Sequence, residues 1–371
     1  MKILLIRLRL IGDVVFTTPL VAALKHSFPD SRLTYLVEQH AAPIVTGNPH
    51  LSEVMVVPRT RGMSRVFDDL RLVKRLRARR FDVVFDLHGG PRSSWLTWAT
   101  GATQRIGYDI QGRSWHYTQT VHRPRGLQPQ HSVANQWELL TALKGWSGAA
   151  ADAGSFPAEM ALDPAVEARI AARLAAAGID SSPPIRARRE VIVIHVSAGN
   201  PFRRWPETAF AALTTGLAAA DDRRRIILSS GPSDRTAADR IARAARRDLG
   251  PARASQVLDF GDVNLSELRA LVARSALFIG GDSGPLHVAS TTTTPIVGIY
   301  GPTLSVRSKP WRDPALATES VEIDGLPCRP CDQRVCAPGD FRCLTRIDSA
   351  AVLAAAERAL APVTTRIRLH S

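Results

Sequence analysis

A strand followed by a helix is encoded in KILLIRLRLIGDVVFTTPLVAALKH, residues 2–26. The β-branched, apolar run at 2–6 is typical of a buried strand, and residues 14–26 have the pattern of a helix. Three further strands continue the alternation, at 32–37, 54–57 and 82–87. Because a helix at 66–80 precedes the last of them, the order predicts a parallel sheet covered by helices on both faces.

The pattern restarts in the second half of the chain, after a stretch at 148–165 that is rich in Ala, Gly, Asp and Ser. A weak helix at 164–177 follows, and we place the interdomain linker at 178–190, which carries two prolines and a basic run. Five more strands are predicted, at 191–195, 225–230, 256–260, 277–280 and 296–300. Asn264 and Glu267 have the spacing of a capping box at the start of a helix that ends near residue 273.

This alternation predicts an α/β protein made of two doubly wound, Rossmann-like domains with a cleft between them. The N-terminal domain is expected over 1–180 and the C-terminal domain over 188–347, followed by a helix and tail over 348–371. A length of 371 residues fits two domains of roughly 150 residues each. Ligands of such sheets bind beyond the carboxyl ends of the strands, so the loops there are the places to look for chemistry.

Composition and charge narrow the class of protein. The chain is 45% apolar and 22% charged, as soluble globular proteins are. No apolar run reaches the roughly 18 residues of a membrane-spanning helix, and Arg7 and Arg9 interrupt the first apolar stretch, so it does not resemble a secretion signal. We therefore expect a cytoplasmic protein. Its net charge of +14 favours anionic partners such as phosphorylated small molecules, nucleic acid or an anionic membrane.

Part of this charge lies in a basic amphipathic helix predicted within residues 65–80. Its cationic residues are Arg65, Arg71, Lys74, Arg75, Arg77, Arg79 and Arg80. Such a helix is usually a solvated surface, and it is also suited to phosphorylated lipid or to a membrane face.

The first strand leads into the turn RLRLIGDVVFTTP, residues 7–19. Gly12 lets the backbone approach a ligand closely, and Asp13 places a carboxylate at the start of the following helix. The carboxylate either caps that helix or acts chemically in the cleft. The dinucleotide-binding pattern G-x-G-x-x-G is absent from this turn.

A second candidate site is the small-residue loop in FIGGDSGPLH, residues 278–287. A proline suits the first turn of a helix, and a helix that begins near Ser283 and Gly284 offers its N–H groups to a diphosphate. His287 is placed to add a hydrogen bond to the same phosphate. The alternative is a tight turn with a capping Asp282.

A third candidate follows the strand at 191–195, in the sequence VSAGNPFRRWP. Ser197 and the two guanidinium groups of Arg203 and Arg204 suit the phosphate of a leaving group. The fold is expected to put this loop beside the one that holds Asp282.

The cysteines are confined to one stretch with the spacing C-x-x-C-x4-C-x6-C. They are Cys328, Cys331, Cys336 and Cys343. Their clustering in an otherwise cysteine-free chain is consistent with a structural zinc site, although the second half lacks the C-x-x-C of a common zinc ribbon. Reduced thiols or disulfides remain the alternatives, and a catalytic thiol is not expected.

Three motifs resemble those of the ADP-heptose:lipopolysaccharide heptosyltransferases. They are R-x-x-x-x-GD-x-x-x-TTP at 7–19, H-x-S…R-x-W-P at 195–206, and D-S-G-P-x-H…GPT at 282–303. They stand in family order across nearly the whole chain, and the cysteine cluster resembles one found in part of the family. The resemblance implies a GT-B fold, with the acceptor on the N-terminal domain and the nucleotide sugar on the C-terminal one.

The resemblance also implies a reaction and its residues. The reaction is an inverting transfer of heptose from ADP-heptose to the inner core of lipopolysaccharide, at the inner face of the cytoplasmic membrane. Carried over residue by residue, Asp13 is the general base, Arg203 contacts the diphosphate and Asp234 contacts the ribose. Asp282, Gly284 and His287 are donor-site residues. The family usually has Lys in place of Arg203, so Arg204 is an alternative contact, and it usually has Glu in place of Asp234.

No carboxylate cluster indicates a catalytic metal, so cationic side chains are expected to neutralise the leaving group, and the cysteine cluster is expected to lie away from the transfer chemistry. Another GT-B transferase with a different nucleotide sugar is the nearest alternative. A basic nucleic-acid-binding protein is an alternative of a different class, and the lack of helix-turn-helix, zinc-finger and RNA-binding signatures counts against it.

Overall fold

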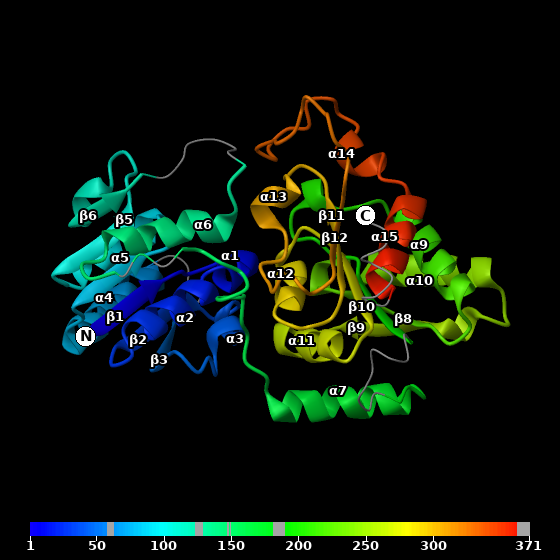
Figure 1. Cartoon of the computed structure of the whole chain (residues 1–371), viewed down its shortest axis with the longest axis horizontal. Helices are drawn as coiled ribbons and strands as arrows, with labels where there is room; N and C mark the ends of the chain where they lie inside the picture. Colours follow the sequence, from blue (N-terminus) through cyan, green and yellow to red (C-terminus); the bar gives the residue numbers. More distant parts are fainter. Residues whose placement is uncertain (58–62, 123–128, 147, 149, 181–189, 362–371) are drawn as a thin grey trace. The chain divides into compact units, whose positions relative to one another are not determined.

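The structure of the chain is a computed structural model that describes residues 1–57, 63–122, 129–146, 148, 150–180 and 190–361. The chain divides into two compact units. Unit 1 contains Met1–Ala161 and Trp311–Asp313, and unit 2 contains Leu162–Pro310 and the chain from Pro314 on. Each unit is built around its own parallel sheet (Figure 1).

The sheet of unit 1 has six parallel strands in the order β3-β2-β1-β4-β5-β6. The strands are β1 (Lys2–Ile6), β2 (Arg32–Glu38), β3 (Glu53–Val57), β4 (Val83–Asp86), β5 (Gln104–Tyr108) and β6 (Gln119–Val121). The helices are α1 (Ile11–Val15), α2 (Thr18–Ser27), α3 (Ala42–Val45), α4 (Met63–Arg79), α5 (Pro91–Ala99) and α6 (Ser132–Trp137), with short 3-10 turns η1 (Ser114–His116) and η2 (Glu138–Ala142). The strand order reverses between β1 and β4, which is where doubly wound sheets bind ligands.

The sheet of unit 2 repeats this topology, with the order β12-β11-β10-β7-β8-β9 and all pairs parallel. The strands are β7 (Val191–His195), β8 (Arg225–Ser230), β9 (Val257–Asp262), β10 (Leu277–Gly281), β11 (Ile296–Tyr300) and β12 (Thr318–Glu322). The helices are α7 (Pro164–Ala176), α9 (Glu207–Ala220), α10 (Arg235–Leu249), α11 (Leu265–Ala273), α12 (Gly284–Ser290), α13 (Ser305–Ser308), α14 (Arg342–Thr345) and α15 (Ser349–Leu360), with 3-10 turns η3 (Pro201–Arg203), η4 (Pro232–Asp234) and η5 (Ala254–Gln256). Here the order reverses between β7 and β10.

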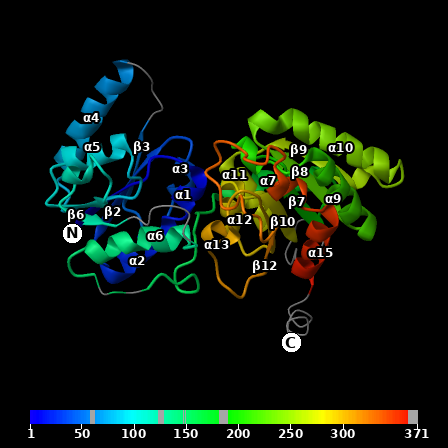
Figure 2. The ribbon, with the colours of Figure 1, turned by 90° about the horizontal axis from the view of Figure 1, so that it is seen from above.

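The division of the chain differs from the expected one at two places. Helix α7 packs on α11 of unit 2, and Arg173 donates a hydrogen bond of 2.8 Å to the carbonyl of Phe260, so unit 1 ends at Ala161 rather than near residue 180. Helix α15 packs beside α9 and β12, so it belongs to unit 2 rather than to a separate tail (Figure 2). Most of the predicted linker, residues 181–189, lies outside the described residues.

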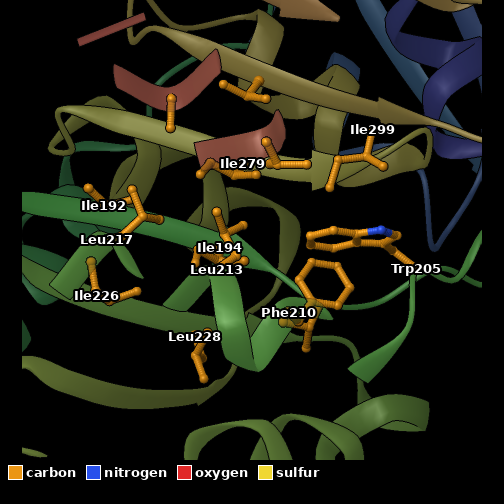
Figure 3. Close-up of a cluster of buried hydrophobic side chains, with 14 of the residues drawn as sticks. Ile192, Ile194, Trp205, Phe210, Leu213, Leu217, Ile226, Leu228, Ile279 and Ile299 are labelled. Carbon is orange, nitrogen blue, oxygen red and sulfur yellow. The ribbon is translucent and has the colours of Figure 1, made fainter. Parts of the chain in front are cut away.

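The core of unit 2 fixes the loop that follows β7. Ile192 and Ile194 point to the same side of β7 and pack with Leu213 and Leu217 of α9 (Figure 3). Trp205, at the end of the loop that follows β7, packs at one end of this cluster. Its ring lies edge-on to Phe210 at 4.8 Å, and its Nε1 donates to the carbonyl of Ile347 at 3.1 Å. The residues just before Trp205 are therefore held at the carboxyl end of β7.

Most predicted elements are confirmed, with instructive exceptions. The capping box of Asn264 and Glu267 is present at the start of α11, with both hydrogen bonds at 3.0 Å. The single helix predicted at 14–26 is two helices, because Pro19 has no N–H to donate to the carbonyl of Val15, which accepts from the hydroxyl of Thr18 instead. Strands β5, β6 and β12 were not predicted. Among the described residues, no helix has the length and apolarity to cross a membrane.

Candidate active site

Three loops meet at the carboxyl ends of β7, β10 and β11 in unit 2. Asp282 lies in the loop after β10, and side chains from the other two loops contact it. Its side chain is only 2% exposed. Arg203 Nη1 lies 3.2 Å from Asp282 Oδ2, Thr303 Oγ1 donates to the same oxygen, and His287 Nε2 lies 3.5 Å from Oδ1. Burial by itself would raise the pKa of Asp282, but His287, Arg203 and Thr303 together lower this pKa to about 2. Asp282 is therefore an anchoring carboxylate that stays ionised.

Arg203 is held in place by this anchor. Its Nη1 donates to the backbone carbonyl of Asp282 at 3.0 Å, and its Nε donates to the side-chain carbonyl of Gln333 at 2.7 Å. Nη2 has no hydrogen-bond partner within the described part of the chain, and the side chain is 29% exposed. Gly281 lets the backbone of Arg203 lie close to β10, because a Cβ at this position would lie a tight 3.3 Å from the carbonyl oxygen of Arg203. Arg203 thus offers a fixed cation with one amino group available.

Arg204 and Asp234 form a second pair beside the first. Arg204 Nη2 lies 3.0 Å from Asp234 Oδ1, and Arg204 Nε donates to the carbonyl of Ala198 at 3.0 Å. Asp234 is buried, and its Oδ2 accepts hydrogen bonds from the hydroxyls of Ser197 and Ser233. Both oxygens of the predicted ribose contact are therefore engaged by protein groups in this structure.

The loop before α12 has the form that the sequence predicts. Ser283 is the N-cap residue, α12 starts at Gly284, and a proline lies in the first turn. The buried Oγ of Ser283 has no hydrogen-bond partner among the described residues, so it is a polar group left for a ligand. His287 was expected to face a phosphate, but its ring instead contacts Asp282 and is 5% exposed.

His195, the first residue of the second motif, is a buried histidine of this site for which the sequence predicts no role. His195 ends β7, its Nδ1 lies 3.0 Å from the Oγ of Ser229, and burial lowers its pKa to about 4. The ring of His195 is therefore neutral near pH 7, and it lies beneath the loops that carry Arg203 and Asp282.

In unit 1, Asp13 lies in the first turn of α1, at the carboxyl end of β1. Its Oδ2 forms an ion pair with Arg7, whose side chain is 8% exposed and which also donates from Nη1 to the carbonyl of Leu87. The N-cap residue is Leu10, and Asp13 makes no hydrogen bond to a backbone N–H among the described residues, although it lies in the first turn, where a carboxylate interacts favourably with the helix dipole. Oδ1 of Asp13 has no partner among the residues described, and the side chain is 29% exposed. Gly12 precedes it as predicted.

The loop that holds Arg7 depends on a buried carboxylate that the sequence did not single out. Asp86 ends β4 and is fully buried. It accepts hydrogen bonds from the hydroxyls of Tyr117 and Ser93 and from the N–H groups of His88 and Gly89, at 2.7 to 3.0 Å. Burial raises the pKa of Asp86, and these four donors oppose the rise. They fix the turn after β4 and with it the carbonyl that orients Arg7.

The cysteine segment does not lie apart from this chemistry, contrary to expectation. Cys331 N–H donates to the carbonyl of Pro302 at 3.1 Å, Arg329 donates to the carbonyl of Thr303 at 2.8 Å, and Gln333 contacts Arg203. Figure 1 shows this segment in orange, between β12 and α14. Cys343 is buried, which raises the pKa of its thiol. All four cysteines are free thiols, and no set of three or more His, Cys, Asp or Glu in the described residues is arranged as a metal site.

Comparisons with known proteins agree with this architecture. A family model described as glycosyltransferase family 9 (heptosyltransferase) matches residues 70–338. The chain is 27% identical over 365 residues to lipopolysaccharide heptosyltransferase 3 of Escherichia coli, covering 96% of this chain and 99% of that protein.

Solved structures show the same fold. The glycosyl transferase family 9 protein of Veillonella parvula superposes with a TM-score of 0.78 at 20% identity, covering 97% of each chain. The E. coli heptosyltransferase WaaC with ADP-2-deoxy-2-fluoro heptose superposes with a TM-score of 0.67 at 20% identity, covering 100% of both chains. The predicted GT-B fold, with two six-stranded parallel sheets, is therefore confirmed.

Proposed function

Because the chain belongs to glycosyltransferase family 9, the heptosyltransferases, we propose that it transfers a heptose from ADP-heptose to the inner core of lipopolysaccharide. The observation that carries this proposal is the contact between Arg203 and Asp282, which come from two separate motifs and form one cationic site at the switch point of the unit 2 sheet. The relative from E. coli is named a lipopolysaccharide heptosyltransferase, and the WaaC structure contains an ADP-heptose analogue.

The donor diphosphate would bind at this cationic site. Nη2 of Arg203 supplies donors for phosphate oxygens, and the N–H groups at the start of α12 and the Oγ of Ser283 add neutral ones. The diphosphate of an ADP-sugar already carries negative charge and gains more as ADP leaves, so Arg203, held in place by Asp282, is suited to stabilise the departing group. Arg204, held by Asp234 on the neighbouring loop, is placed to assist.

In the proposed reaction, the acceptor hydroxyl attacks the anomeric carbon while the bond from that carbon to the β-phosphate oxygen breaks. The electron pair leaves with ADP, and the hydroxyl proton passes to Asp13. Two features support Asp13 as this base. The ion pair with Arg7 fixes the carboxylate through Oδ2, and Oδ1 keeps its lone pairs for the proton. A single displacement of this kind inverts the anomeric configuration.

We also propose that the enzyme works at the cytoplasmic membrane face, where its acceptor would be anchored. Helix α4 supports this because its first turns expose Val66, Phe67 and Leu70 to solvent. These apolar side chains lie on the same helix as the exposed cations Arg71, Lys74 and Arg75. Apolar groups flanked by cations are the composition of a helix that lies on an anionic bilayer.

The proposal is tested by turnover with ADP-heptose against a panel of truncated core acceptors. Release of ADP that requires one particular truncated core would identify the acceptor. Calorimetry with ADP, UDP and GDP tests the nucleotide separately. Equal or tighter binding of UDP would refute the ADP-sugar assignment and favour a family member with another nucleotide sugar.

A further inference from the structure

Gln333 joins the cysteine segment to the cationic site. Its side-chain carbonyl accepts two hydrogen bonds, from Arg203 Nε at 2.7 Å and from Asn200 Nδ2 at 2.9 Å. Asn200 is itself the N-cap residue of η3, where its Oδ1 accepts from the N–H of Phe202 at 3.0 Å. One oxygen therefore ties the beginning and the end of η3, the short turn that carries Arg203.

The backbone of Gln333 has an unfavourable conformation, which indicates that its side chain makes a favourable contact in return. Its φ is +59°, in the left-handed region that a glycine or asparagine adopts at lower cost. A strained residue persists where the surrounding structure benefits from it. The benefit visible here is the pair of hydrogen bonds to Asn200 and Arg203.

The hydrogen bond also affects which atoms Arg203 has left for a ligand. Gln333 takes Nε and Asp282 takes Nη1, so the planar guanidinium is fixed at two of its three nitrogens and Nη2 remains. Without Gln333, Arg203 could rotate about the contact with Asp282. The cation would remain, but its direction would no longer be set.

We propose that Gln333 is a positioning residue, which fixes Arg203 for binding the diphosphate of the donor. This inference rests on the proposed function, since it takes Arg203 as the diphosphate contact. The segment has two further ties to the same loops, because Arg329 donates to the carbonyl of Thr303 at 2.8 Å and Phe341 packs edge-on against Phe202 at 5.2 Å. The stretch between β12 and α14 is thus part of the donor site, and Gln333 is its point of contact with the cation.

A double-mutant cycle tests this role, with ADP binding measured by calorimetry. Gln333→Met keeps the length of the side chain and removes the acceptor, so we expect ADP to bind about 3- to 10-fold more weakly, as for the loss of one ordinary hydrogen bond. In an Arg203→Met background, Gln333→Met should have no further effect, because its target is gone. Equal losses in the two backgrounds would overturn the proposal, and so would wild-type affinity of Gln333→Met.

A second variant separates positioning from folding. Gln333→Gly removes the side chain but relieves the left-handed backbone, so the melting temperature should stay the same or rise while ADP binding weakens. A parallel fall of both quantities would mean that Gln333 only stabilises the segment. The matched control is Val335→Thr, an exposed position on the same segment, which should bind ADP as the wild type does.

The same measurements distinguish failure of this inference from failure of the proposed donor. If the wild type binds UDP in preference to ADP, the ADP assignment fails, and the cycle repeated with UDP still decides the role of Gln333. If the wild type binds ADP and the cycle shows no coupling, the donor stands and the positioning role falls. A wild type that binds no nucleoside diphosphate would refute both.

Discussion

Replacing Asp13 by Asn removes one negative charge and almost no volume, so it tests the base directly. Asn can still accept a hydrogen bond from Arg7, but the bond loses its charge assistance. The change from a charged to a neutral hydrogen bond costs about 1 kcal/mol of unfolding free energy, and solvent at the 29% exposed carboxylate keeps this figure low. If Asp13 takes the proton, turnover should fall by roughly 10²–10⁴-fold, which is about 3–5 kcal/mol of activation free energy.

The catalytic effect therefore exceeds the stability effect, and the two can be measured independently. Initial rates at saturating ADP-heptose give turnover, calorimetry gives ADP affinity, and chemical unfolding gives stability. Asp163→Asn is a matched control, because Asp163 does cap its helix, and Asn caps equally well. Asp13→Ala should be less stable than Asp13→Asn by about 1–3 kcal/mol, since it leaves the nearly buried Arg7 without the hydrogen-bond acceptor that Asn still provides. Near-normal turnover by a folded Asp13→Asn protein would remove Asp13 from the mechanism.

Three further predictions concern the cysteines, a buried histidine and the basic helix. Elemental analysis of anaerobically purified protein should find about one zinc per chain if the thiols hold metal, and a metal-free, fully active preparation would contradict the zinc assignment. Loss of one zinc ligand in Cys331→Ser should then lower stability, and it should also weaken ADP binding, because the same segment contacts Arg203 and Thr303. Burial of His195 lowers its pKa to about 4, so between pH 6.5 and pH 4 the unfolded chain binds a proton that the folded chain does not. About 3 kcal/mol of unfolding free energy that is present above pH 6.5 should therefore be lost as the pH falls to 4. His195→Gln should flatten this pH dependence in unfolding titrations, and an unchanged slope would show that other groups cause it. Reversing the charges of Arg71, Lys74 and Arg75 should strongly reduce sedimentation with anionic vesicles, because each cation contributes about 1 kcal/mol of binding free energy. The same reversal in α10, at Arg240, Arg243 and Arg247, should not reduce it. Equal binding by the α4 variant and the wild type would mean that α4 is an ordinary solvated surface.

The sheet was predictable wherever a strand is buried on both faces. β1, β7 and β11 are continuous apolar runs, and their bounds match the prediction. β6 and β12 are edge strands with polar, partly exposed residues, so they carry no apolar signal. They become strands only because a neighbour offers them a ladder of hydrogen bonds.

The site was predictable to the same extent. Motifs and strand ends indicated Asp13, Arg203 and Asp282, because each residue follows a strand of the sheet directly or by one short loop. Gln333 gave no signal, since its role depends on a contact with Arg203 across 130 positions and on a left-handed backbone that no local pattern requires. The contact of His287 Nε2 with Asp282 was not predictable either, because spacing along a helix does not say which neighbour a side chain will meet.

The assignment of Trp311–Asp313 to unit 1 has a consequence for the order of events during synthesis on the ribosome. The indole N–H of Trp311 donates to the carbonyl of Phe156 at 2.9 Å, and the backbone carbonyl of Trp311 accepts from the N–H of Ala158 at 2.9 Å. The Trp311 ring lies 4.7 Å from the ring of His131. At roughly 5–20 residues per second, the tryptophan emerges on the order of 10–30 s after the rest of unit 1. During that interval the nascent first unit lacks the two hydrogen bonds and the ring contact that Trp311 supplies, so unit 1 completes its packing only after most of unit 2 has been synthesised.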